Sequence, residues 1–90
     1  MANSKSALKR IRQNEVRRDR NRSARSAMRT TIKSVRRAIE LGELTKASEL
    51  LPEAVRIIDV TARKRVIHQN TADRTKSRLV RAVATAQAAS

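Results

Sequence analysis

Six basic residues in the first half of the chain recur at spacings of three and four, which places them on one face of a helix. This row, called the cationic rail below, consists of Arg18, Arg22, Arg25, Arg29, Lys33 and Arg36. At about 1.5 Å per residue, the rail is more than about 25 Å long. Guanidinium and ammonium groups form strong hydrogen bonds with anionic oxygens, and contacts of this kind to nucleic acids go mainly to phosphates. The rail therefore predicts phosphate binding rather than the reading of base edges.

Groups that could support catalysis or hold a metal are scarce. The chain has no cysteine and one histidine, His68, so disulfides, thiolate metal sites and cysteine nucleophiles are excluded. A solitary histidine is more typical of a helix cap or a packing residue than of a catalyst. None of the eight acidic residues pairs with a candidate nucleophile. We expect no enzyme, no catalytic residue, no metal site and no cofactor.

The charge is large and unevenly distributed. The 90 residues carry 22 Lys and Arg against eight Asp and Glu, a formal net charge of +14. Residues 1–41 hold thirteen basic and three acidic side chains, residues 42–60 hold two and four, and residues 61–90 hold seven and one. A surface that only had to remain soluble would mix both signs. The imbalance predicts a polyanionic partner and favours nucleic acid.

The absence of Phe, Tyr and Trp narrows the kind of nucleic acid. Unpaired bases have no stacking platform, so recognition of duplex shape and junctions is favoured. DNA is the alternative, either through a histone-like architectural mode or through a basic-region helix, which Asn21–Ala24 followed by Arg29 resembles. Against a basic region, Gly42 would end the helix before any leucine heptads, and Arg25 stands where that motif has a small residue.

A membrane partner is not expected. No apolar run approaches the roughly 20 residues of a membrane span. A basic amphipathic helix nevertheless leaves binding at a membrane surface to be tested.

The rail requires a long helix, and residues 4–41 can form one because they contain no glycine or proline. Asn3 or Ser4 offers an N-cap side chain, and Gly42 is a suitable C-cap. A mostly apolar stripe on one face of this helix, called the stripe below, begins only at Ala24. It consists of Ala24, Met28, Thr31, Ile32, Val35, Ala38 and Ile39. We therefore expect the second half of the helix to pack and the first half to project.

Two shorter helices should follow. Apolar spacing predicts one at about 43–64, which should be kinked near Pro52 because proline lacks the backbone N–H. It predicts another at about 68–87, near the start of which Asn70 and Asp73 resemble a capping box. Leu, Ile and Val total 19, so the core should be thin. The predicted fold is all-α: an antiparallel three-helix bundle with a long projecting N-terminal helix, in one domain of residues 1–90.

Three stretches resemble the signatures of bacterial small-subunit ribosomal proteins of the S-twenty family. They are Met1–Ala7 followed by Lys9-Arg10; Ser26–Thr30 with Lys33; and Val66–Ala72 followed by Arg74 and Lys76–Leu79. The resemblance spans the whole chain in register. One departure is Arg65, because the family usually has glycine before Val-Ile-His. This departure puts the geometry of the second turn in question.

The resemblance implies direct binding of 16S ribosomal RNA early in assembly, low on the body of the small subunit. There the protein would bridge RNA helices of the 5′ domain and the long 3′ minor-domain stem. The resemblance also places Lys5, Lys9 and Arg10 in the projecting half of the first helix. It further implies RNA contact or framing by His68, Asn70, Lys76 and Arg78.

The full candidate RNA-binding set joins these residues to the rail and to three further arginines. It consists of Lys5, Lys9, Arg10, Arg12, Arg17, Arg18, Arg22, Arg25, Arg29, Lys33, Arg36, His68, Asn70, Arg74, Lys76 and Arg78. The implied partners are 16S ribosomal RNA and other small-subunit components. The implied location is the cytoplasmic small ribosomal subunit, with one copy of the chain and no small-molecule substrate.

Overall fold

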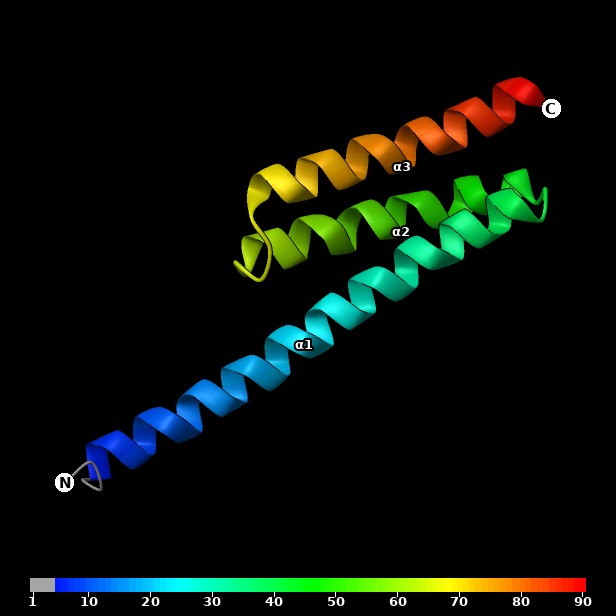
Figure 1. Ribbon diagram of the computed structural model, residues 1–90. Helices are drawn as coiled ribbons and strands as arrows, with labels where there is room; N and C mark the ends of the chain where they lie inside the picture. Colours follow the sequence, from blue (N-terminus) through cyan, green and yellow to red (C-terminus); the bar gives the residue numbers. More distant parts are fainter. Residues whose placement is uncertain (1–4) are drawn as a thin grey trace.

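Three α-helices account for nearly all of the computed structural model, which describes residues 5–90. They are α1 (Lys5–Glu40), α2 (Leu44–Arg63) and α3 (Gln69–Ala89). α2 runs back along the second half of α1, and α3 reverses direction again, so α1 and α3 point the same way (Figure 1). The predicted all-α three-helix bundle with a long first helix is confirmed over the described residues.

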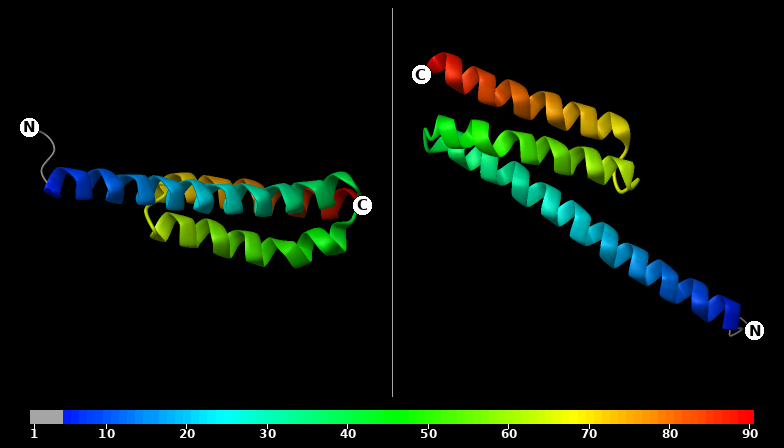
Figure 2. Two further views of the ribbon diagram at one scale, coloured as in Figure 1. Left: turned by 90° about the horizontal axis from the view of Figure 1, so that it is seen from below. Right: turned by 180° about the vertical axis from the view of Figure 1, so that it is seen from behind.

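The molecule is elongated because α1 extends far beyond the other two helices. Its principal extents are 66 × 22 × 15 Å and its radius of gyration is 17.9 Å, whereas a compact chain of this length has about 12 Å. The first half of α1 stands clear of the bundle in every view (Figures 1 and 2). α2 packs against both other helices, while α1 and α3 have little direct contact.

The core is a thin layer of aliphatic side chains. Its largest fully buried members are Val35 on α1, Ile58 on α2 and Leu79 on α3. Buried alanines, including Ala54 and Ala72, let the helix backbones approach closely. Within the described residues, each helix therefore contributes one large aliphatic residue to a common centre, and no aromatic side chain is needed to fill it.

The stripe predicted on α1 faces this core. Met28, Val35 and Ala38 are buried, and Ile32 and Ile39 pack against the cluster from its edge. N-terminal to residue 24 the situation changes, since no residue from 5 to 23 is buried. We call residues 5–23 the arm. Its large apolar side chains, Leu8, Ile11 and Val16, are more than half exposed.

Both connections between helices use a residue with positive φ. Gly42 (φ 76°) follows α1, and the N–H groups of Gly42 and Glu43 donate to the carbonyls of Ile39 and Ala38. Arg65 (φ 61°) follows α2 with the same pattern. Its N–H donates to Ala62 O at 2.9 Å, and the Val66 N–H donates to Thr61 O at 3.1 Å. These are Schellman caps, whose left-handed position usually holds glycine.

Arg65 thus occupies a backbone conformation that favours glycine. Left-handed geometry costs a side chain with a Cβ roughly 1–2 kcal/mol. The second turn, whose geometry the sequence left in question, therefore keeps the ordinary shape of a glycine cap while carrying an arginine in it.

Pro52 bends α2 without breaking it, as the predicted kink requires: α2 is one continuous helix, and its ribbon bends near the proline (Figure 2, left). Other details differ from the sequence-based expectations. α3 begins at Gln69 and continues to Ala89, two residues beyond the predicted end. The predicted N-cap at Asn3 or Ser4 lies outside the described residues.

The predicted capping box at Asn70 is wrong. Asn70 lies inside α3, and the cap is His68, whose Nδ1 accepts a hydrogen bond from the Asn70 N–H at 3.0 Å. Asp73, the other half of the predicted box, instead accepts from the Gln69 side chain at 2.9 Å. The imidazole satisfies an N–H group that would otherwise have no partner at the start of the helix.

Replacing Val35 or Ile58 by aspartate should abolish the bundle. Either change places a carboxylate in a site with no exposure, and burying an unpaired charge costs several kcal/mol, against a total stability of about 5–15 kcal/mol for a small domain. Thermal unfolding followed by circular dichroism should lose its cooperative transition. Arg18→Ala, on the exposed arm, should leave that transition nearly unchanged. A cooperative melt in both aspartate variants would show that the core has been assigned wrongly.

Replacing Arg65 by glycine should stabilise the free protein by about 1 kcal/mol, because it removes the left-handed strain but adds glycine's larger entropy loss on folding. For a domain of this size, the melting temperature should rise by about 4–8 °C. Arg65→Ala keeps a Cβ at the same φ and should give no comparable gain. Equal melting temperatures for the glycine variant and the parent would contradict the assigned strain.

Candidate nucleic-acid interface

The C-terminal end of the rail, at Arg36, lies beside the groove that separates α1 from α3, whereas Arg18 and Arg22 belong to the arm. Five rail side chains are exposed and Arg25 is half-buried. The groove has a volume of about 600 Å³. Its walls include Ile39 from α1 and Ala82 and Ala86 from α3, with Arg36 on one rim and Arg78 and Arg81 on the other. The groove is therefore apolar within and cationic at both edges.

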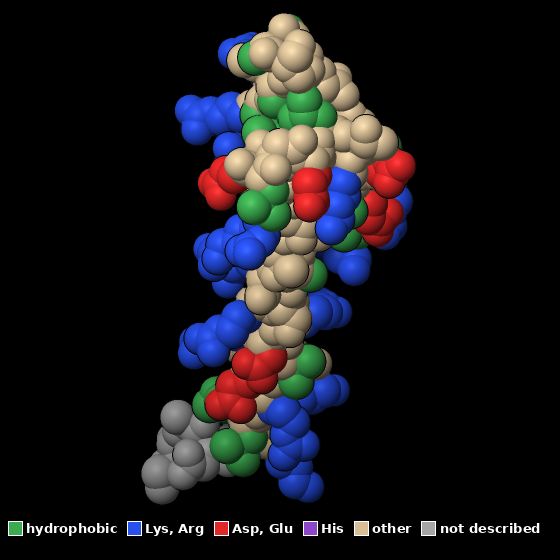
Figure 3. Space-filling model, turned by 90° about the vertical axis from the view of Figure 1, so that its right-hand side faces the viewer, with side chains coloured by type: hydrophobic (Ala, Val, Ile, Leu, Met, Phe, Trp, Pro, Cys, Tyr) green, Lys and Arg blue, Asp and Glu red, His purple; other side chains and the backbone are tan. Residues whose placement is uncertain are grey.

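α3 carries a second row of arginines along this groove. Arg74, Arg78 and Arg81 follow one another at helical spacing, and all three are exposed. Together, the rail and this row form a surface that we call the α1–α3 face. In Figure 3, mostly basic side chains project along one flank of the bundle, whereas basic and acidic side chains lie together on the other.

Arg81 was absent from the candidate set, although it lies on the same rim as Arg78. Its helical spacing from Arg74 and Arg78 was the sequence signal that could have added Arg81 to the candidate set. The neighbourhood of the rail and the α3 row could not be read from sequence, because it depends on how α1 and α3 are both placed by α2.

No carboxylate neutralises the α1–α3 face. Over residues 5–90, the ion pairs involve only Lys46, Arg56 and Lys76 among the basic side chains. The basic residues of α1 therefore have no acidic partner in the described part of the chain. Their charge is left for an external anion or for solvent.

α2 shows the opposite arrangement, because two of its cations, Lys46 and Arg56, are paired locally. Lys46 lies 3.8 Å from Glu43, and the Arg56 guanidinium makes two hydrogen bonds to Glu53, at 2.6 and 3.0 Å. The bonded guanidinium lowers the pKa of Glu53, and Glu53 in turn raises the pKa of Arg56. α2 is thus a near-neutral centre that packs, between two helices that retain their charge.

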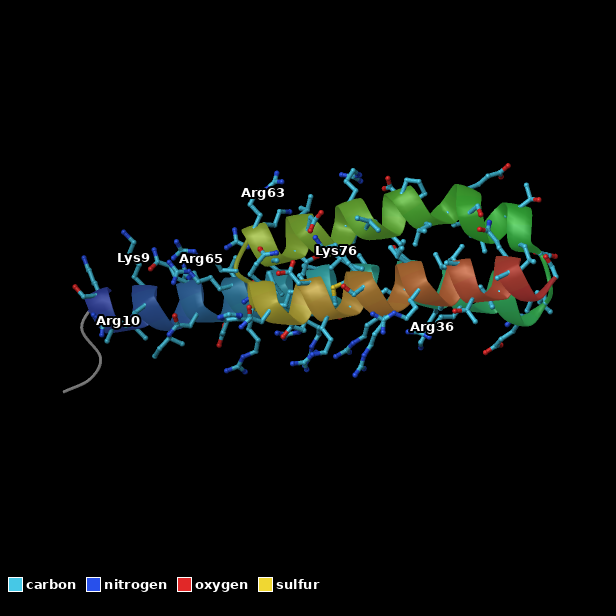
Figure 4. The ribbon with its side chains drawn as sticks, turned by 90° about the horizontal axis from the view of Figure 1, so that it is seen from above. Lys9, Arg10, Arg36, Arg63, Arg65 and Lys76 are labelled. Atoms are coloured by element: carbon cyan, nitrogen blue, oxygen red, sulfur yellow. The ribbon has the colours of Figure 1, made fainter. Side chains whose placement is uncertain are left out.

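Lys76 has a partner inside the protein. Its Nζ lies 2.6 Å from Asp59 on α2 and 3.6 Å from Asp73 on α3. The pKa of Lys76 is raised, chiefly by the hydrogen bond to Asp59. Figure 4 shows Lys76 between the two helices rather than on their outer side. Its geometry suits holding α3 against α2 more than reaching an outside phosphate.

The candidate residues of the arm are all exposed, but they do not share one direction. Lys9 and Arg10 project to opposite sides of α1 (Figure 4). The set comprises Lys5, Lys9, Arg10, Arg12 and Arg17. An arm with cations on both sides can be surrounded by phosphates and needs no protein surface to lie on.

Other chemistries find little support in the described residues. No group of three His, Asp or Glu side chains within residues 5–90 comes together as a metal site would require. In the same region, no helix combines the length and apolar character that crossing a membrane takes.

Comparison with known proteins gives a consistent result across the chain. Residues 2–84 match the family described as Ribosomal protein S20. A relative from Geobacter metallireducens, named "Small ribosomal subunit protein bS20", is 51% identical over 94% of this chain and 98% of its own length. A relative of the same name from Burkholderia cenocepacia is 51% identical over 99% of both chains. The family match includes all of α1 and α2, and α3 as far as residue 84.

Proposed function

The chain belongs to the ribosomal protein S20 family, and from this premise we propose that it binds 16S ribosomal RNA directly through phosphate contacts. As a member of this family it is a structural protein of the small ribosomal subunit and not an enzyme. It is located in the cytoplasmic ribosome. Its partners would be 16S RNA and neighbouring small-subunit components, with one copy of the chain per subunit.

The observation that supports RNA binding most strongly is the α1–α3 face. It carries two rows of basic side chains, of which Arg36, Arg78 and Arg81 line one groove, and no member of either row has a carboxylate partner within residues 5–90. Phosphates along an RNA backbone would supply the missing counter-charge. Because the chain has no aromatic residue, binding would depend on the shape and charge of structured RNA rather than on stacked bases.

Bridging of RNA helices fits the shape of the molecule. The bundle offers the α1–α3 face, and the arm extends away from it with cations on both sides (Figures 2 and 4). One RNA segment could follow the face while a second approaches the arm. As the family resemblance implies, the two bridged segments would be RNA helices of the 5′ domain and the long 3′ minor-domain stem.

The candidate residues divide into two roles in this proposal. Phosphate contact falls to the candidate cations of α1, all exposed except the half-buried Arg25, and to Arg74 and Arg78. Framing falls to His68, Asn70 and Lys76, which fix the start of α3 through the cap and the link to Asp59. A framing residue would affect RNA affinity by displacing the arginines of α3.

DNA binding has no observation of its own in its favour. α1 ends at Glu40 and the chain turns back at Gly42, so it does not continue into the zipper that a basic-region helix needs. We therefore retain ribosomal RNA as the ligand, and duplex DNA becomes a comparison in the test.

Replacing Arg22 and Arg29 together by glutamine should weaken RNA binding through lost counterion release. Each phosphate contact contributes roughly 0.7–0.9 to the slope of log affinity against log salt, so the double variant should lose roughly 1.4–1.8 of that slope. Preference for the correct RNA over duplex DNA should remain, because phosphate contacts position more than they specify. Filter binding of a 16S RNA fragment across a salt series measures both quantities.

The matched control is Lys46→Gln with Arg56→Gln, which also removes two positive charges. Both residues already have carboxylate partners on or beside α2, so the slope should barely change. Glutamine keeps good helix propensity in all four positions. Equal slope losses in the two double variants would mean that the charge acts diffusely and that the rail makes no specific contacts.

A further inference from the structure

A second cationic hollow lies at the elbow, the place where the arm leaves the bundle. There the turn between α2 and α3 comes against the middle of α1 (Figure 1). The hollow has a volume of about 560 Å³. Its lining consists of Arg20, Asn21, Ser23, Ala24, Lys64 and Val66. It therefore joins two segments that are at least forty positions apart in sequence, and none of its lining residues belongs to the α1–α3 face.

The charges around the hollow are all of one sign. Arg20 comes from α1 and Lys64 from the turn, and no acidic residue is among the lining side chains. Neither cation has an ion-pair partner within residues 5–90. Two like charges that face a common space repel each other. An anion placed between them would remove this repulsion and gain attraction from both.

Arg65 adds a third cation beside the hollow, at a cost to the backbone. It lies between two lining residues, Lys64 and Val66, and holds a φ of 61°. Its side chain is exposed and has no ion pair in the described part of the chain. No interaction of its guanidinium within residues 5–90 therefore offsets the left-handed strain. Residues with strained backbone conformations concentrate at ligand-binding sites, where the side chain binds the ligand and does not stabilise the fold.

The direction of these side chains is visible from above the molecule. In Figure 4, Arg63 and Arg65 project to the same side as Lys9, whereas Arg36 on the rail projects to the opposite side. Arg65 thus projects away from the side that Arg36 faces. The lining also offers uncharged donors, the Ser23 hydroxyl and the Asn21 amide.

We propose that the elbow is a phosphate-binding site in which Arg20, Lys64 and Arg65 hold one phosphodiester of a bound RNA. The proposal rests on the proposed function for the source of the phosphodiester, and it adds a site that the rail and the α3 row do not include. A fixed phosphate at this point would set the angle between RNA on the bundle and RNA on the arm.

Inorganic phosphate tests the site without RNA. Isotope-labelled protein is titrated with phosphate against chloride at equal ionic strength, and amide shifts are followed by NMR. Saturating shifts should concentrate at residues 20–24 and 64–66, and they should be strongly reduced in Lys64→Gln and Arg65→Gly. Arg63→Gln removes a neighbouring cation that belongs to the last turn of α2 and not to the turn that carries Lys64 and Arg65, and it should leave the shifts in place. Shifts spread evenly over all basic segments, or equal in the three variants, would overturn the proposal.

RNA binding supplies a second readout that separates this site from the rail. Arg65→Gly should lower the salt slope by roughly 0.7–0.9, although the same change relieves backbone strain, so the loss cannot come from unfolding. The loss should add to that of the Arg22 and Arg29 double variant. If the Arg65→Gly variant kept the salt slope of the parent while the Arg22 and Arg29 double variant still lost slope, the proposed phosphate site at the elbow would be wrong and the proposed RNA binding would stand. If the protein binds no RNA, the proposed function fails, and the phosphate titration still decides the elbow.

Discussion

The packing of the α1 stripe onto α2 is the interaction on which the rest of the structure depends. Val35 meets a layer completed by Ile58 and Leu79, and this layer is only one large side chain deep per helix. Because the stripe begins at Ala24, the bundle holds only the second half of α1. The same helix then continues for about five turns with nothing to pack on, and its orientation is fixed by the packed half.

Whether the cations of a helix are paired depends on how much of that helix packs against protein. α2 touches protein on two sides, its Lys46 and Arg56 are paired with Glu43 and Glu53, and its Asp59 pairs with Lys76 of α3. α1 and α3 each keep a free side and a row of unpaired cations along it. A net charge of +14 would oppose folding by self-repulsion. RNA phosphates would relieve that repulsion, so RNA binding and ordering of the arm would be thermodynamically coupled.

Much of the architecture could be predicted from the sequence because local signals agreed. An uninterrupted run to Gly42, a stripe starting at Ala24 and a core-facing pattern through Ile58 define three helices and the end that projects. The errors occurred where two residues could satisfy one backbone group. Asn70 fits the usual cap, but the imidazole of His68 fills that role, because the chain reverses at Val66 and Ile67 and leaves His68 extended.

The features of the candidate site that sequence did not reveal all depend on tertiary packing. The meeting of the rail with Arg78 and Arg81 across one groove requires α2 to set both helices. The pairing of Lys76 with Asp59 crosses from α3 to α2, which spacing along α3 alone cannot show. The elbow brings Arg20 to Lys64, and the strain at Arg65 follows from a cap whose geometry the sequence only put in question.

Hydrogen exchange along α1, measured on the free protein and on its complex with a 16S RNA fragment, tests the central claim most directly. The account predicts a step in the free protein, with protected amides C-terminal to Ala24 and rapidly exchanging amides in the arm, because helices in water gain most of their stability from packing. Binding of RNA should extend protection through the arm. Uniform protection of α1 in the free protein, or an arm that stays unprotected in the complex, would contradict an arm that is ordered by RNA.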